Sequence, residues 1–379
     1  MSSYMVDPLI LSMAFRKLTP VDKDIDRQAR LKIVFLDQAL VLIRADREHS
    51  AEVVVPADGT GSGSICVEWI KLVSIFKNGV AKQPVKLSYE DGDPHLAINQ
   101  KIIRMKVPVL IGDVRIAYAF SDDALEYSLE PEQAVAFFRS LEITSVFCTN
   151  KIVGRGKFAG VVVHANRLVG ASHDGVFIGR SGVATPDYFG LPYGVVWSLL
   201  AYAGSENMSV TVGAGAVTPG KIRAVFFSGT SDGLAWTLRF PFIRPAHSSL
   251  GLDLTKVVEP KSGQFGFNVE AQHLKDSFIS ASSIQGKSDV WVDLLGVTET
   301  GLSVRASDVE NITEAHNFAE ISEFRGEFVG LQVKKASVLG LLSHLTGLLQ
   351  VSFDRATSVL AIQNGEGLAL LACNMKEGD

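Results

Sequence analysis

Residues 215–222 come closest to a known chemical motif. They read Gly-Ala-Val-Thr-Pro-Gly-Lys-Ile and nearly match the phosphate-binding loop Gly-x-x-x-x-Gly-Lys-Ser/Thr. The last position of that loop needs a hydroxyl group to bind Mg²⁺, and Ile222 has none. The loop must also open a helix, whereas residues 223–227 have the apolar composition of a strand. We therefore expect no nucleotide site here.

Two other glycine-rich stretches lack the residues that such chemistry needs. Residues 59–64 are not followed by a Lys-Ser/Thr pair, and their composition predicts a flexible loop before a helix. Residues 154–160 have the wrong spacing for a dinucleotide site. The two cations in that second stretch are better suited to phosphate contact.

His173 and Asp174 have the types of a general base and the carboxylate that orients it. No Gly-x-Ser-x-Gly motif or reactive-cysteine motif accompanies them. An aspartate recurs at positions 46 and 308, which favours a role in turns. The eight histidines show no metal-ligand spacing, and no Cys-x-x-Cys occurs. We expect no metal, no cofactor and no catalytic site.

The composition is that of a globular protein with more than one domain. The chain has 379 residues, 47% of them hydrophobic, and domains usually contain about 100–150 residues. The formal net charge of −5 means that any DNA contact must come from local basic patches. There is no secretory signal pattern, no run of about 18 apolar residues and no close cysteine pair. We expect a cytoplasmic protein with reduced thiols.

Three segments follow one order of predicted elements: helix, hairpin, second helix, strand and hairpin. In the first helix, residues 14–18 match residues 137–141 at a distance of 123, with a weaker copy around residues 277–279. Asp7 before Pro8 is a typical helix start. The hairpin of each segment contains a strand that ends in an aspartate. These strands are residues 40–46, 168–174 and 302–308.

The second helix and the strand after it recur as well. Trp69 matches Trp197 at a distance of 128, and Val338 lies opposite Trp197 at a distance of 141. The extra residues of the third copy fall near residues 323–327. The following strand recurs at residues 87–89, 210–212 and 351–353.

These repeats predict an α+β fold of three domains, each with two helices packed on antiparallel sheet. We place the domains at residues 1–122, 123–250 and 251–379. Three unrelated α+β domains that share a common pattern are the alternative.

Three such units in one chain resemble the bacterial beta-type DNA sliding clamp, the DNA polymerase III beta subunit family. Residues 173–178 match a Thr-Asp-Gly-His-Arg-Leu pattern of that family, of which Asp174 and Gly175 are kept. Residues 239–241 match the Arg-Phe-Pro that closes its middle domain. Residues 191–195 lack the basic residue of the family's Val-Pro-basic helix start, and its Met-Pro-Met-Arg-Leu-like tail is not reproduced after residue 370. The chain therefore resembles a divergent member.

The resemblance implies a head-to-tail homodimeric ring, closed by β-edge pairing between the first and third domains. The candidate edges are residues 102–107 and 288–292, which alternate apolar and polar side chains. Interior strands are the alternative reading of both. The expected dimer-interface residues are Ile103, Arg104, Met105, Lys106, Asp289, Val290 and Trp291.

The resemblance also implies an inner surface whose Lys and Arg side chains contact DNA phosphates without reading bases. A surface lysine is usually only solvated, and residues 195–203 carry no basic residue, which weakens this expectation locally. Arg16 and Lys17 are further candidates on the first helix. The expected DNA-binding residues are Lys23, Arg27, Arg30, Lys71, Lys77, Lys151, Arg155, Lys157, Lys275, Lys287, Lys334 and Lys335.

The third implied feature is an apolar cleft between the second and third domains, which binds short peptide motifs of partner proteins. Several of its positions differ from the family, so the peptide preference is expected to differ too. Ordinary core packing is the alternative for each position. The expected cleft residues are Phe158, His173, Val176, Phe177, Ile178, Pro241, Leu370, Leu371 and Met375.

Together these features predict a DNA sliding clamp, a polymerase processivity factor without catalytic activity. It would encircle double-stranded DNA without sequence specificity, and tether a polymerase and a clamp loader through short peptide motifs. It would be a homodimer with no membrane contact. The alternative is a clamp-fold interaction protein that binds clamp partners without topological DNA tethering. An enzyme with an unrecognised site between the domains is a third hypothesis.

Overall fold

The chain forms two compact units in the computed structural model, Met1–Phe138 with Gly194–Ile243 and Arg139–Tyr193 with Arg244–Asp379. Both predicted domain boundaries, after residues 122 and 250, lie outside the described residues, so the three-domain division stays a prediction. No helix of the described chain is long and apolar enough to cross a membrane. The structure describes residues 1–19, 30–45, 49–78, 83–101, 103–114, 125–148, 160–172, 175–205, 207–215, 222–243, 265–286, 291–298, 301–308 and 313–375.

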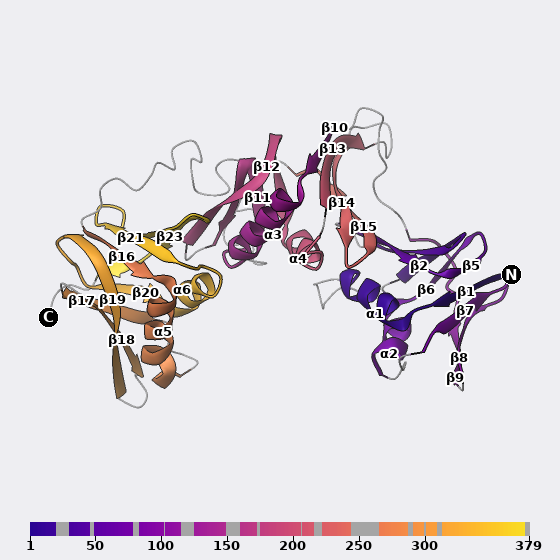
Figure 1. Ribbon diagram of the computed structural model, residues 1–379, viewed down its shortest axis with the longest axis horizontal. Coiled ribbons are helices and arrows are strands. Elements are labelled where there is room, and N and C mark those ends of the chain that lie inside the picture. The colour runs from indigo at the N-terminus through magenta and orange to yellow at the C-terminus, as the bar shows by residue number, and fades with distance from the viewer. Residues whose placement is uncertain are drawn as a thin grey trace. The chain divides into compact units, whose positions relative to one another are not determined.

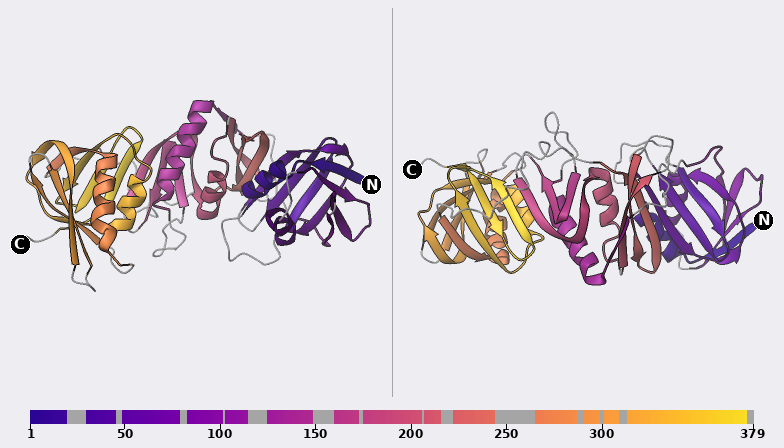
Figure 2. Two further views of the ribbon diagram at one scale, coloured as in Figure 1. Left: turned by 60° about the horizontal axis from the view of Figure 1, so that its bottom comes forward. Right: turned by 90° about the horizontal axis from the view of Figure 1, so that it is seen from above.

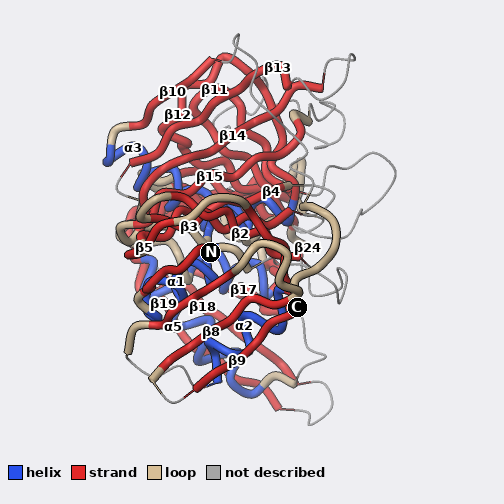
Figure 3. The backbone as a smooth tube through the Cα atoms, turned by 90° about the vertical axis from the view of Figure 1, so that its right-hand side faces the viewer, coloured by secondary structure: helices blue, strands red, loops and turns tan. Residues whose placement is uncertain are grey.

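Strands make up most of the described chain, and the α-helices pack against them (Figures 1 and 3). The first repeat begins with a well-defined helix, because the Asp7 carboxylate accepts a hydrogen bond from the Leu9 backbone N–H and Pro8 occupies the first turn. Its elements are β1 (Ser2–Val6), α1 (Pro8–Lys17), β2 (Arg30–Leu36), β3 (Ala39–Ala45), β4 (Ser50–Pro56), β5 (Asp58–Thr60), β6 (Ser64–Glu68), α2 (Trp69–Asn78), β7 (Val85–Tyr89), β8 (His95–Gln100) and β9 (Ile103–Pro108).

The middle and third repeats follow the same order. The middle repeat has β10 (Leu125–Leu129), α3 (Pro131–Ser145), β11 (Gly160–Ala171), β12 (Gly175–Pro192), α4 (Tyr193–Leu200), β13 (Asn207–Gly215), β14 (Ile222–Ser231) and β15 (Leu234–Pro241). The third has β16 (Phe265–Glu270), α5 (Ala271–Ala281), β17 (Trp291–Thr298), β18 (Gly301–Asp308), β19 (Thr313–Gly326), β20 (Leu331–Lys334), α6 (Lys335–Leu342), β21 (Leu348–Asp354), β22 (Val359–Gln363), β23 (Gly367–Ala372) and β24 (Asn374–Met375). In the third repeat α5 and α6 lie side by side against the strands (Figure 2).

Strand register confirms the predicted repeat. The first strand of each repeat pairs antiparallel with the strand after its second helix, and the pairs are Ser2 with Tyr89, Leu125 with Val212, and Phe265 with Phe353. The predicted alignments of the first helix and of this strand are therefore correct. The alignment of the two tryptophans is wrong by about one helical turn, since Trp69 opens α2 and Trp197 is the fifth residue of α4.

Each joint between consecutive repeats is a strand pair that continues one sheet into the next repeat. In the first compact unit β4 pairs with β15, which gives the strand order β10-β13-β14-β15-β4-β3-β2-β6. In the second unit β12 pairs with β23, within the order β11-β12-β23-β22-β21-β16-β19-β18-β17-β20-β24. A third sheet, β5-β1-β7-β8-β9, belongs to the first repeat alone.

A buried cation stabilises the joint between the first two repeats. Lys17, at the end of α1, is only 5% exposed, and its Nζ lies 2.8 Å from the Asp232 carboxylate in the β14–β15 turn. Lys17 also donates a hydrogen bond to the Ser231 hydroxyl. The expectation that Lys17 is a cation for DNA is therefore wrong, because its charge is satisfied inside the protein.

The glycine-rich residues 59–64 are only partly a loop, which corrects the prediction: residues 59 and 60 belong to β5, residue 64 begins β6, and residues 61–63 connect the two strands. Gly59 lies in β5, paired with β1 in register with Tyr4. A Cβ atom on Gly59 would lie 2.1 Å from the Ser3 carbonyl oxygen. Glycine is needed here because the two backbones approach too closely for any side chain.

Gly59→Val is expected to lower the free energy of unfolding by about 1–3 kcal/mol, because the added side chain must push β5 away from β1. Urea denaturation measures the loss. Thr60→Val, at an exposed position in the same strand, is the matched control and should change little. Equal stability of the two variants would contradict the close packing described.

Lys17→Met should change how stability depends on pH. The hydrogen bond from Lys17 lowers the pKa of Asp232. A lowered folded-state pKa contributes stability that is present above the unfolded pKa of about 4 and is lost as the pH falls through the folded value. The difference in unfolding free energy between wild type and variant should therefore be largest near neutral pH and narrow in acid. A difference that stays constant from pH 7 to pH 3 would show that the ion pair contributes nothing.

Candidate partner cleft, strand edges and helix surface

One face of the β12–β23 joint is an apolar surface made of three half-buried side chains and one, Ile178, that is 8% exposed. Val176 lies directly opposite Leu370, and Ile178 lies opposite Leu368. Side chains two residues apart on a strand share a face, so all four lie together. We call this set, Val176, Ile178, Leu368 and Leu370, the apolar strip. Sequence reasoning missed Leu368, although its alternation with Leu370 was a sufficient signal.

Phe177 and Leu371 lie on the other face of this joint, and their assignment to the cleft is wrong. They are 0% and 1% exposed and belong to one hydrophobic core with Phe147, which follows α3, and Leu341 of α6. In a strand, neighbouring residues point to opposite faces. A run of adjacent positions cannot all line one cleft.

The other predicted cleft residues have separate places. Pro241 ends β15, opposite Ala224, and is half-buried. Met375 is 41% exposed in β24, where it pairs with Leu331. Phe158 and His173, together with Asp174, lie outside the described residues.

β9 lies at the edge of its sheet, as predicted for residues 102–107. It pairs with β8 on one side, and no described strand pairs with it on the other. Arg104 and Lys106 are exposed and Met105 is half-buried, while Ile103 begins the strand.

The second predicted edge is wrong where the structure describes it. Trp291 opens β17, which pairs with β18 on one side and with β20 on the other, so it is an interior strand. Asp289 and Val290 lie outside the described residues. Trp291 lies opposite Lys334, whose Nζ is 5.7 Å from the centre of the indole ring.

The first half of β19 is an unpaired edge of the third repeat. Residues 313–320 pair with β18, and no described strand adjoins their other side. Two large apolar side chains are exposed here, Phe318 at 63% and Ile279 of α5 at 48%. The Ser277 hydroxyl donates a hydrogen bond to the Phe318 carbonyl oxygen and joins the helix to this edge.

Most predicted DNA-binding cations that the structure describes have partners inside the protein. Arg30 Nη1 donates to the Ile111 carbonyl oxygen at 3.1 Å, and Lys335 Nζ donates to the Ser282 carbonyl oxygen at 3.3 Å. Lys71 is 55% exposed and pairs with Glu68 at 2.7 Å. Lys275 is half-buried on α5, and Lys77 lies on α2. Lys23, Arg27, Lys151, Arg155, Lys157 and Lys287 lie outside the described residues.

The exposed positions of the described helices carry more large apolar side chains than cations. Arg16 and Lys71 are the exposed cations among the helix side chains that the structure describes, which do not include Lys77. The exposed apolar residues are Leu9 at 66%, Ile70 at 52%, Val135 at 61%, Trp197 at 36% and Ile279 at 48%. This surface is therefore less basic than the sequence reasoning expected.

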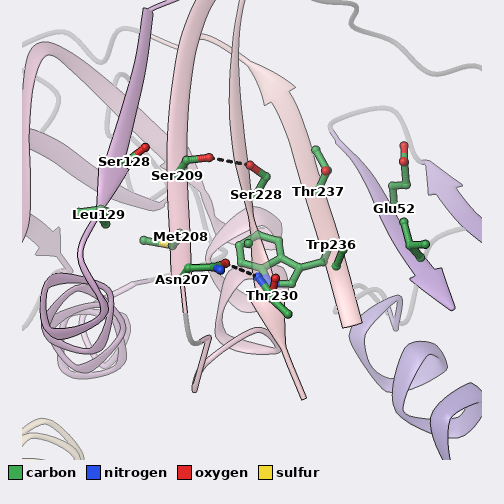
Figure 4. Close-up of a pocket in the computed structure, with 13 residues that line it drawn as sticks. Glu52, Ser128, Leu129, Asn207, Met208, Ser209, Ser228, Thr230, Trp236 and Thr237 are labelled. Atoms are coloured by element: carbon green, nitrogen blue, oxygen red, sulfur yellow. Dashed lines mark hydrogen bonds between the residues drawn. The ribbon is translucent and has the colours of Figure 1, made fainter. Parts of the chain in front are cut away.

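A hollow of about 410 Å³ lies on the sheet between β4 and β10 (Figure 4). Hydroxyl and amide groups line it, including Ser209, which lies 2.8 Å from Ser228, and Asn207, which accepts from the Thr230 backbone N–H. Its carboxylate, Glu52, forms an ion pair with Arg239 at 3.0 Å. Among the described residues that line this hollow, no nucleophile is therefore paired with a base.

The cysteines do not supply such a nucleophile. Burial raises the pKa of Cys148 and of Cys373 to about 12, and it also raises the pKa of Cys66. A thiol with a raised pKa is protonated at neutral pH and reacts poorly. Within the described ranges, no three His, Cys, Asp or Glu side chains converge as a metal site requires.

Comparison with known proteins establishes the fold. No family model and no curated protein matches the sequence. The DNA polymerase III beta subunit of Thermotoga maritima aligns with a TM-score of 0.77 at 14% identity, over 99% of each chain. The DNA polymerase sliding clamp of Bacillus subtilis gives 0.77 at 13%, also over 99% of each. The DNA polymerase III subunit beta of Pseudomonas aeruginosa gives 0.74 at 15%, over 98% of this chain and 99% of that one. The predicted α+β clamp fold is confirmed.

Substitutions at two neighbouring positions of β12 should show by their effect on stability which side chain lies in the core and which lies on the surface. Phe177→Ala leaves a cavity in the shared core and should cost about 3–5 kcal/mol of unfolding free energy. Val176→Ala, on the apolar strip, should cost about 1 kcal/mol or less. Chemical denaturation of both variants measures the difference. A larger loss for Val176→Ala would reverse the assignment of the two faces.

Proposed function

We propose that this protein is a DNA sliding clamp, a ring that encircles duplex DNA and tethers a polymerase and its loader. One observation carries the proposal. Two joints continue a sheet from one repeat into the next. At the two ends of the series, no described strand pairs with the equivalent edges, which are β9 and the first half of β19. Such edges favour pairing with another chain. A second copy supplies the complementary edge at each end, and two chains of three repeats close the ring, as in the family the sequence resembles.

The internal repeat predicts the register of this seam. In the first repeat, three residues lie side by side on neighbouring strands: Ser88 on β7, Ala97 on β8 and Lys106 on β9. Their counterparts in the middle repeat are Thr211 on β13, Phe226 on β14 and Arg239 on β15. Lys106 therefore takes the place of Arg239, which lies opposite Ser50 on β4.

On the opposing strand, the counterpart of Ser50 is Glu314. Ser50 lies opposite Ala45, and Glu314 lies opposite Ser307, the residue that matches Ala45 in the third repeat. Lys106 of one chain thus faces Glu314 of the other. An opposite-charge pair across an antiparallel seam supports the pairing.

The charges along the two edges are complementary beyond this pair. Lys101 and Arg104 are also exposed on or beside β9, and Glu320 is also exposed on β19. Complementary edges favour head-to-tail association and disfavour pairing of two identical edges.

The apolar strip supports the second part of the proposal, which is that the protein tethers a polymerase and its loader. Partly exposed apolar side chains on one face of a sheet suit a short partner segment that inserts large apolar side chains. Polymerase and loader peptides are the partners that this surface would take. A ring on DNA acts where the DNA is, so the protein would be cytoplasmic.

The alternative is a clamp-fold interaction protein that binds clamp partners without topological DNA tethering. The exposed helix positions Leu9, Ile70 and Val135 are apolar, whereas a DNA-facing surface usually gains affinity from cations. If the protein is a ring, it should stay on DNA only while the DNA has no free ends. If the alternative holds, the protein should not stay on DNA at all.

The ring should be a stable dimer of twice 40.9 kDa by size-exclusion chromatography with light scattering. Once loaded, it should remain on nicked circular duplex and leave when the duplex is linearised. Lys106→Glu should yield monomers by opposing Glu314, and adding Glu314→Lys should restore the dimer. Lys71→Glu, an exposed charge on α2, is the control for a charge change alone.

Two results would contradict the proposal. A chain that stays monomeric at every concentration would exclude the two-chain ring. A dimer that leaves circular and linear DNA equally fast would favour the interaction protein.

A further inference from the structure

Two arginines lie side by side next to the apolar strip. Arg167 on β11 is directly opposite Arg180 on β12, and both side chains are exposed. No ion pair or hydrogen bond joins either guanidinium group to another residue that the structure describes. Like charges directly opposite each other on neighbouring strands destabilise a sheet. The contacts of the described chain therefore give no reason for this pair of charges.

The acid beside Arg180 does not neutralise it. The backbone N–H of Arg180 donates to the Glu366 carbonyl oxygen at 3.4 Å. The Glu366 carboxylate, however, accepts a hydrogen bond from Nε of Arg139 on α3 at 3.2 Å. Protection of an edge strand by a cation explains Arg167, since no described strand pairs with the other side of β11. It does not explain Arg180, because β12 pairs with both β11 and β23.

The two arginines point to the same side of the sheet as the apolar strip. A Cβ atom on Gly179 would collide with the Ser140 hydroxyl of α3, so Gly179 faces that helix. Neighbouring residues of a strand point to opposite faces. Arg180 therefore points away from α3, together with Ile178 and Val176, which lie two and four positions before it. One cation and two apolar side chains thus follow each other along β12 at intervals of about 6.6 Å.

We propose that Arg167 and Arg180 bind a carboxylate side chain of a partner segment whose apolar side chains lie on the apolar strip. An arginine can donate two parallel hydrogen bonds to one carboxylate. An extended segment repeats its side chains at the same interval as β12, so its order is an acid, any residue, an apolar residue, any residue and a second apolar residue.

Charge complementarity and continuity with the apolar strip support an acidic peptide as the occupant. The resemblance to clamps directs the helices toward DNA, whereas Arg180 points away from α3. An encircled duplex is therefore not the anion that this pair would meet. The inference rests on the proposed function, because it specifies the partner segment that the apolar strip would take.

Two synthetic peptides test the inference by fluorescence anisotropy with the full chain. One has the order glutamate, threonine, leucine, threonine, leucine, and the other has glutamine in place of glutamate. Wild type should bind the glutamate peptide more tightly, and added NaCl should reduce this preference by screening the charges. Arg167→Met and Arg180→Met should each weaken binding of the glutamate peptide roughly two- to fivefold. Neither should change the affinity for the glutamine peptide.

Arg325→Met is the matched control. It removes a cation that is 79% exposed and already pairs with Glu323, so it should leave both affinities unchanged. Urea denaturation should show that Arg167→Met and Arg180→Met are as stable as wild type, because neither substitution breaks a contact within the described chain. Equal affinity for the two peptides, no binding of either, or an equal effect of Arg325→Met would overturn the inference.

The same variants separate this inference from the ring itself. If Arg180→Met weakens retention on circular DNA and leaves peptide binding unchanged, the arginines contact nucleic acid and the inference is wrong. A wild type that forms a stable dimer but shows no preference for glutamate would overturn the inference alone. A wild type that stays monomeric yet prefers the glutamate peptide would overturn the ring and leave the anion site standing.

Discussion

The architecture depends on backbone hydrogen bonding between strand edges. An edge strand exposes unpaired N–H and C=O groups, and a chain must cover them, pair them or leave them for a partner. Two of the joints here pair them, β4 with β15 and β12 with β23, so neighbouring repeats share a sheet. Because the repeat is finite, one equivalent edge is left over at each end. The proposed ring follows because a second copy of the chain can pair with each of these two edges.

Side chains then fix how the paired repeats meet. At the β12–β23 joint Gly179 lies opposite Gly367, and a Cβ on Gly179 would be 2.0 Å from the Ser140 hydroxyl. The absence of side chains lets α3 settle directly on the joint. Lys17 pairs with Asp232 at the first joint, and Arg139 pairs with Glu366 at the second. Because Asp232 is 55% exposed and Arg139 is 38% exposed, solvent screens both pairs, and each adds specificity more than net stability.

Sequence reasoning found the repeat because strands and helices impose periods on the chain, and the distance between copies is visible without a structure. It misplaced Trp197 because a shift of about one turn keeps most of an apolar pattern on the same helix face. It wrongly expected β17 to be an edge strand, because the strand that pairs with the other side of β17 is β20, which is distant in sequence. It placed Phe177 in the cleft because matching by family position ignores which way each side chain of a strand points.

The shared core of the second compact unit also bears on how such a chain can be divided. Phe147 and Phe177 belong to the middle repeat by sequence, yet they pack in one core with Leu341 and Phe353 of the third. A fragment that holds the third repeat alone would lose those two aromatic rings and would leave β23 as an unpaired edge strand. The repeat is thus the unit of sequence duplication but not the unit of autonomous folding. Recombination between chains of this fold at a breakpoint within residues 139–193 would divide both compact units, whereas a breakpoint at a border of the middle repeat would divide only one.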